Sequence, residues 1–194
     1  EKYGVSRRDQ DEFALHSHLR AAKAHADGAF KTEIAPIEIK QKKQTLVIES
    51  DETIRADSTL ESLAGLKPAF GKDGTVTAGN ASQLADGAAM VLLTTPEEAA
   101  KRGWKVRARI LAHATFGVAP KELFIAPVGA VRKALEIAGL KTSDIDVYEL
   151  NEAFSAQAVA CIRQLEIDER KVNICGGGVA LGHPIGVSGA RVLV

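Results

Sequence analysis

From residue 88 onward, short apolar runs alternate with segments of helical spacing, and this alternation constrains the fold more than any other feature of the sequence. The run 88–93 is entirely apolar, which is typical of a strand buried on both faces. Such strand–helix alternation predicts an α/β chain with helices on the faces of its sheet. The other expected strands are 106–118, 147–150 and 172–175, and the expected helices are 95–102, 126–139, 153–165 and one from residue 188 onward.

The first part of the chain opens with a predicted helix, from about residue 6 to residue 26. Ser6 and Asp9 have the spacing of a capping box, and Asp27-Gly28 is a typical helix end. We expect the histidines on this helix to face solvent, because no regularly spaced acidic or cysteine co-ligand accompanies them. These histidines are His16, His18 and His25.

Residues 33–49 alternate in places between apolar and polar side chains, which predicts two short strands around the charged turn 40–43. Residues 51–79 are irregular apart from a short helix near 60–64. A long irregular stretch within a compact protein is usually functional or covers a partner.

The overall charge is balanced, with 25 basic and 25 acidic residues among 194. We therefore expect no nucleic-acid partner, because nucleic-acid-binding domains usually carry a basic excess. No apolar run approaches the length of a membrane-spanning helix, so we expect no membrane partner either. The chain begins at Glu1, and the helix expected near its other end should continue past Val194. We therefore expect it to be an internal piece of a longer protein.

Cys161 and Cys175 are the only cysteines in the sequence. Two cysteines without a CxxC spacing indicate neither a disulfide framework nor a zinc site. We expect a reducing compartment, the cytoplasm, with a mitochondrial or peroxisomal location left open. Cys161 lies in an apolar stretch of helical spacing and is expected in the core. Cys175 precedes three glycines, and a catalytic role there is a minor alternative.

Two segments could carry chemistry. Asn151 stands where a strand is expected to end and a helix to begin, so it could be a helix cap, with Glu152 in the first turn. Alternatively, it faces the crevice at the carboxyl ends of the strands, where α/β proteins bind ligands. His183 lies in a loop, 176–189, in which half of the residues are Gly or Pro. A histidine held in so rigid a loop favours a functional role, and the loop satisfies no phosphate-binding or serine-hydrolase motif.

These segments resemble motifs of the thiolase family. The matching motifs are NEAF at 151–154, GHPIG at 182–186, GTVTAGNAS at 74–82, DGAA at 86–89 and the IR…KPAF segment that ends at Phe70. Within the family they are most similar to acetyl-CoA acetyltransferases and 3-ketoacyl-CoA thiolases. The resemblance runs over essentially the whole chain and implies an α/β fold of mixed sheets with helices on both faces, present in part, plus part of an irregular α+β loop domain.

The resemblance also implies an activity and a set of site residues. The family transfers acyl groups between coenzyme A thioesters by Claisen condensation or thiolysis. His183 would activate a nucleophilic cysteine and donate to the thioester oxyanion, and Asn151 would hold a water that completes the oxyanion hole. Coenzyme A and acyl-CoA would be substrates, with no resident cofactor or metal. The residues that match coenzyme A contacts are Arg55, Ser62, Ala69, Phe70, Ala78, Ser82, Leu84, Ala153 and Phe154.

The chain departs from the family pattern in its cysteines. Neither the nucleophilic cysteine nor the C-x-G acid/base cysteine has a counterpart, so we expect no turnover by this piece alone. The family implies three parts: residues 1–84 in the coenzyme A-binding loop domain, 85–105 returning to the N-terminal half, and 106–194 in a truncated C-terminal half. It also implies a homodimer or homotetramer at full length.

Two alternatives remain beside the enzyme. One is a non-catalytic module that binds acyl-CoA. The other is a related condensing enzyme of fatty acid or polyketide synthesis, whose histidine arrangements fit the two motifs less well.

Overall fold

The computed structural model describes residues 2–194. Its longest element is helix α1 (Arg7–Ala26), which begins at the expected capping box: the Ser6 hydroxyl accepts from the Asp9 amide, and the Asp9 carboxylate accepts from the Ser6 amide. One face of α1 is buried and includes Phe13, Ala14 and His18. The expectation of solvent-facing histidines is wrong for His18, which is only 2% exposed because its face of α1 is covered. His16 and His25 are exposed.

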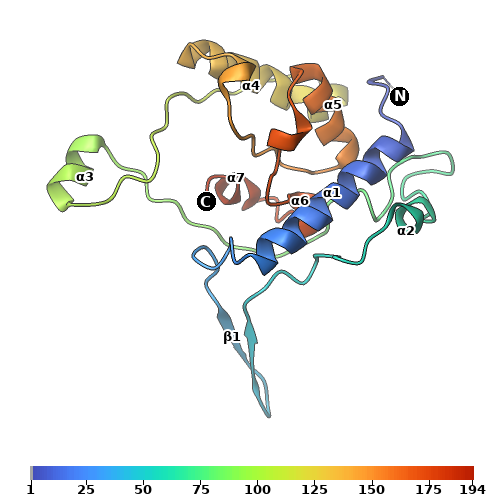
Figure 1. The fold of residues 1–194 in the computed structure, drawn as a ribbon, viewed down its shortest axis with the longest axis horizontal. Coiled ribbons are helices and arrows are strands. Elements are labelled where there is room, and N and C mark those ends of the chain that lie inside the picture. The colour runs from blue at the N-terminus through green and yellow to red at the C-terminus, as the bar shows by residue number, and fades with distance from the viewer. Residues whose placement is uncertain (1) are drawn as a thin grey trace.

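The expected pair of strands forms an antiparallel hairpin of β1 (Ile37–Lys40) and β2 (Thr45–Ile48), with Ile37 opposite Ile48. Both strands are mostly exposed, and the hairpin projects away from the helices (Figure 1). The chain then runs through α2 (Leu60–Ala64), which packs beside α1. Among residues 2–194 this hairpin is the whole of the regular sheet.

The main core lies between α1 and the helices of the second half of the chain. Phe13 of α1 packs against Val159 and Ile162 of α5 (Ser155–Leu165) and against Val172. Helix α4 (Ala126–Ala138) follows the 3-10 turn Pro120–Ile125 and covers the other side of α5, where Val128 meets the fully buried Cys161. Cys161 is therefore a core residue, as expected. Shorter elements complete the chain: the turns Thr142–Asp144 and Glu169–Lys171, and helices α6 (Gly178–Leu181) and α7 (Ser188–Arg191).

Several expected strands do not form within the described residues. Residues 88–93 and 106–118 are extended but pair with no strand, and they lead out to α3 (Pro96–Arg102), which lies apart from the other helices (Figure 1). The prediction of a fully buried strand at 88–93 is wrong here, since Met90 is 91% exposed. A strand requires a neighbour to pair its backbone groups, and no part of residues 2–194 supplies one. The segments 147–150 and 172–175 share only a single parallel bridge, between Tyr148 and Val172.

Within residues 2–194, none of the helices has the length and apolar character needed to cross a lipid bilayer.

Candidate active site

The side chains of Asn151 and His183, 32 positions apart, meet in the structure. Asn151 Nδ2 lies 3.3 Å from His183 Nε2. Helix α5 begins at Ser155 with Phe154 as its N-cap, so the interpretation of Asn151 as a helix cap is wrong. The turn 151–154 separates Asn151 from the helix and leaves its amide free to face the imidazole.

The imidazole of His183 is held on several sides. Its backbone N–H donates to the Gln83 carbonyl at 2.9 Å, and its Nδ1 lies 2.6 Å from the Ser188 hydroxyl, which can donate to this nitrogen or accept from it. Burial lowers the pKa of His183, and the positive charge of Arg191 lowers it further. The ring is therefore mainly neutral at pH 7, as a general base requires.

Glu152 does not lie in the first turn of a helix, contrary to the interpretation from the sequence. Its side chain is 1% exposed, and three donors surround its carboxylate: Ser17 Oγ at 2.7 Å, Asn173 Nδ2 at 2.7 Å and the Val179 N–H at 3.0 Å. Burial raises the pKa of Glu152, and the three hydrogen bonds oppose that rise. The sequence does not indicate that Glu152 is a buried hydrogen-bond acceptor, because an acidic residue in the exposed first turn of a helix would occur in the same sequence pattern.

The glycine-rich loop packs tightly against its surroundings. Gly176 has φ +81°, and a Cβ there would lie 2.6 Å from both Ala21 Cβ and the Ser17 carbonyl oxygen of α1. A Cβ at Gly177 would lie 2.3 Å from the carboxyl carbon of Glu152. Larger residues are therefore excluded at both positions by close contacts, and at Gly176 by the backbone conformation as well.

Three of the expected coenzyme A contacts, Arg55, Ser62 and Ala78, line one cavity of about 260 Å³. His18 lines the same cavity and its Nδ1 accepts from the Arg55 N–H at 3.2 Å. Sequence reasoning missed His18, because nothing in the local pattern shows that this face of α1 borders a cavity.

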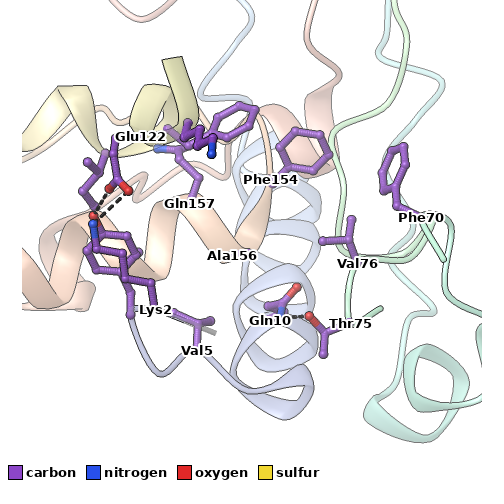
Figure 2. A pocket seen from close by; sticks show the side chains of 15 residues that line it. Lys2, Val5, Gln10, Phe70, Thr75, Val76, Glu122, Phe154, Ala156 and Gln157 are labelled. Carbon is purple, nitrogen blue, oxygen red and sulfur yellow. Dashed lines mark hydrogen bonds and ion pairs between the residues drawn. The ribbon is translucent and has the colours of Figure 1, made fainter. Parts of the chain in front are cut away.

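Two other expected contacts, Phe70 and Phe154, line a larger apolar cavity of about 530 Å³ (Figure 2). Phe154 makes edge-to-face contacts with both Phe70 and Phe124. Phe124 and Gln157 also line this cavity and were not expected from the sequence.

The remaining expected contacts line neither cavity. Ser82 donates its backbone N–H to the Ala153 carbonyl at 3.2 Å, which joins the two segments that carry them. The Ala69 N–H donates to the Val76 carbonyl, and the Leu84 side chain is 98% exposed.

Cys175 is a poor candidate for a nucleophile. Burial raises the pKa of its thiol, and the carboxylates of Glu149 and Glu33 raise it further. A reactive cysteine needs the opposite environment, one that stabilises the thiolate.

Comparison with known families gives two matches that together span nearly the whole chain. A family model described as "Thiolase, N-terminal domain" matches residues 1–97, and one described as "Thiolase, C-terminal domain" matches residues 104–194.

Among curated proteins, the chain is 50% identical to a probable acetyl-CoA acyltransferase of Staphylococcus aureus. It is 52% identical to a beta-ketoadipyl-CoA thiolase of Pseudomonas knackmussii and 48% identical to a 3-ketoacyl-CoA thiolase of Bacillus subtilis. These alignments cover 98–100% of the chain but 48–51% of the relatives. The chain therefore spans about half the length of the curated relatives it matches.

Two solved structures have the same arrangement. The acetyl-CoA acetyltransferase of Bacillus anthracis superposes with a TM-score of 0.97 at 49% identity, over 100% of this chain and 49% of that one. Human mitochondrial 3-ketoacyl-CoA thiolase gives a TM-score of 0.92 at 41% identity, over 99% of this chain and 49% of the other.

Proposed function

The chain belongs to the thiolase family and has a thiolase-like fold, and from this premise we propose that it carries part of the active site of an acetyl-CoA acetyltransferase or 3-ketoacyl-CoA thiolase. The substrates are acyl-CoA thioesters, and the reaction is Claisen condensation or thiolysis of a 3-ketoacyl-CoA such as acetoacetyl-CoA. The observation that carries the proposal is the contact between Asn151 and His183, 3.3 Å apart.

The proposed chemistry uses these two side chains in different roles. His183 takes the proton of a cysteine thiol, and the thiolate then attacks a carbonyl carbon. In condensation this is the thioester carbonyl, and coenzyme A leaves as a thiol. In thiolysis it is the 3-keto carbonyl, the C–C bond breaks, and the acid/base cysteine protonates the acyl-CoA carbanion. An imidazole that is neutral at pH 7 can accept that proton, and the lowered pKa of His183 supports this role. Asn151 holds a water that donates to the oxyanion. Donors placed where negative charge develops contribute a large part of the rate acceleration in acyl transfer.

The substrate contacts form the second part of the proposal. The cavity with Arg55, Ser62 and Ala78 binds coenzyme A, and its cationic guanidinium suits a ligand that carries phosphates. In the complete site the same coenzyme A ligand is also contacted by Ala69, Ser82, Leu84 and Ala153. It further contacts Phe70 and Phe154. The rest of the proposal is a cytoplasmic homodimer or homotetramer at full length, which uses coenzyme A as substrate and has no resident cofactor.

The first prediction concerns His183. In the natural protein that carries this sequence, His183→Ala should abolish acetoacetyl-CoA thiolysis, because His183 is the base assigned to the thiol proton and the side chain that contacts Asn151. Loss of absorbance of the 3-ketothioester measures the rate. His25→Ala is the matched control, since His25 is exposed on α1. Near-normal thiolysis in the His183 variant would refute the role assigned here.

The cysteines distinguish the enzyme from a non-catalytic acyl-CoA-binding module. We propose that the nucleophile and the acid/base cysteine lie outside this sequence and that these 194 residues do not turn over alone. The intact mass of the natural protein tests this point. About twice 20.6 kDa, the ratio expected from its relatives, supports the enzyme. A mass of 20.6 kDa, with acetyl-CoA binding but no thiolysis, favours the binding module.

A further inference from the structure

A fully buried carboxylate, that of Glu152, follows Asn151 in the chain, and its donors come from three parts of the chain. Ser17 belongs to α1, Asn173 follows the turn Glu169–Lys171, and Val179 belongs to α6. Helices α1 and α6 also pack against each other (Figure 1). We propose that Glu152 is a positioning residue that holds the glycine-rich loop against the 151–154 turn, so that Asn151 and His183 meet. Its effect on catalysis rests on the function proposed above, whereas its effect on geometry does not.

In every hydrogen bond of its side chain, Glu152 is the acceptor. Ser17 Oγ accepts from the Gly177 N–H at 3.1 Å, so its own proton is available for the Glu152 carboxylate. Asn173 Oδ1 accepts from the Leu150 N–H at 2.7 Å, which orients its amide so that Nδ2 points to the Leu150 carbonyl and to Glu152. Position 152 is therefore surrounded by donors and requires a side chain that accepts at both oxygens. A glutamine would present an NH₂ group to at least one of them.

The same carboxylate connects both members of the pair. Asn151 precedes Glu152 in the chain. On the other side, Val179 is part of the short helix α6, which ends at Leu181 and leads through Gly182 into His183. The two glycines before Val179 lie directly against this turn. A Cβ at Gly178 would be 3.1 Å from the Glu152 carbonyl oxygen and 3.5 Å from Asn151 Oδ1. Glu152 therefore binds the loop at the point where the loop passes Asn151.

The energetics argue that packing is not the only role of Glu152. Burying a carboxylate is costly, and an apolar side chain of similar size often stabilises a protein as well or better. The carboxylate provides directional bonds to three separated segments, which an apolar side chain cannot. A network of this kind orders the loop in one arrangement, and catalytic geometry depends on such order.

The test compares Glu152→Gln with Glu149→Gln. Glu149 lies three residues earlier, is exposed, and makes no hydrogen bond through its side chain among residues 2–194, so its substitution controls for loss of a nearby negative charge. His183 is titrated by NMR well below the unfolding temperature. In Glu152→Gln we expect its pKa to rise toward the ordinary value of 6.5, because a released loop exposes the ring, and the nuclear Overhauser contact between Asn151 and His183 to be lost. Glu149→Gln should change neither signal in this way.

Ser17→Ala provides a second test in case the Glu152→Gln variant fails to fold. It removes one donor, keeps the carboxylate, and should shift the His183 titration in the same direction by a smaller amount. If either folded variant, Glu152→Gln or Ser17→Ala, has lower thermal stability while its His183 titration and Asn151 contact match the wild type, Glu152 is merely structural and the proposal is overturned. An unchanged stability with unchanged signals overturns it equally.

Kinetics of the natural protein separate this proposal from the proposed function. Glu152→Gln should lower kcat by tenfold or more, with KM for acetoacetyl-CoA changed by less than about twofold, because misplaced catalytic groups affect the transition state more than substrate binding. If NMR shows the expected change but the wild type has no thiolysis activity, the proposed function fails and the positioning role of Glu152 stands. If the wild type is active and the variant keeps its kcat, the positioning role in catalysis is wrong.

Discussion

Ser188 contacts the ring nitrogen of His183 that does not face Asn151. Ser188 is 3% exposed, and its hydroxyl lies 2.6 Å from Nδ1 and 3.2 Å from the Pro184 carbonyl oxygen. We predict that Ser188→Ala costs about 1 kcal/mol of unfolding free energy, because the substitution removes a hydroxyl that has two partly buried hydrogen-bond contacts. We also predict that it allows the ring to populate both neutral tautomers. Denaturant unfolding and the two ring ¹⁵N shifts measure these effects.

The control for this change is Ser143→Ala, an exposed serine whose loss should affect neither quantity. Wild-type ¹⁵N shifts at both ring nitrogens in Ser188→Ala would contradict the prediction, since the tautomer would then be set without Ser188.

At the scale of single residues, the sequence predicts the roles of some side chains in the candidate site and not those of others. Asn151 and His183 could be selected because their motifs are specific and because polar groups at strand ends and in rigid loops are few. Glu152 and His18 could not, because their roles depend on contacts 135 and 37 positions away in sequence, with Ser17 and Arg55 respectively. Local sequence patterns carry no information about such contacts. A buried charged residue therefore cannot be distinguished from a solvent-exposed one in the sequence before its hydrogen-bond donors are known.

Helix α1 provides the clearest prediction among the secondary-structure elements. Ser6→Ala removes the hydroxyl that caps its first turn, and we expect a loss of about 1 kcal/mol in unfolding free energy at pH 7. Hydrogen bonds from Ser6 hold the pKa of Asp9 below its usual value of 3.8. The stability contributed by ionised Asp9 is therefore present above pH 3.8 and is lost as the pH falls through the lowered pKa. The Ser6→Ala penalty should accordingly be smaller at low pH.

Thr59→Ala is the matched control. Thr59 caps α2 in a similar capping box, but its partner is the uncharged Ser62. Its penalty, measured by urea unfolding at the same two pH values, should not depend on the ionisation of a carboxylate. Equal pH dependence in the two variants would show that Asp9 does not contribute to the α1 cap.

The sequence predicts the helices, turns and hairpin that depend on residues close together in the chain. Otherwise it does not predict whether a strand forms, because a strand needs a second strand to pair with. The α1 cap, the hairpin 37–48 and the Gly139 end of α4 each depend on neighbouring residues in sequence. The run 88–93 has the composition of a buried strand, but composition cannot provide the strand beside it. Its exposure in the structure follows from the lack of a pairing partner within residues 2–194.

At the scale of the whole molecule, an exposed connection joins two parts of the chain that form their main core against each other. Residues 103–119 form no helix or strand, and every residue from 101 to 110 is exposed, including Lys105, Arg107 and Arg109. Across this connection α1 packs on α5 and α6. Arg20 of α1 also donates to the Val172 carbonyl at 2.7 Å, and Ser17 donates to Glu152. The interactions that hold the two regions together therefore do not depend on the connection.

This arrangement predicts the outcome of limited trypsin digestion. Cleavage should occur first between residues 101 and 110, because an exposed extended backbone enters a protease site more readily than a helix does. Lys23 on α1 should resist cleavage and is the internal control. After the first cut, the two pieces should elute together in gel filtration and separate only in denaturant, because the buried contacts of Phe13, Ser17 and Arg20 still join them. Mass spectrometry identifies the cut. Pieces that separate in native buffer would mean that the contacts between α1 and α5 are too weak to hold the site together without the covalent connection.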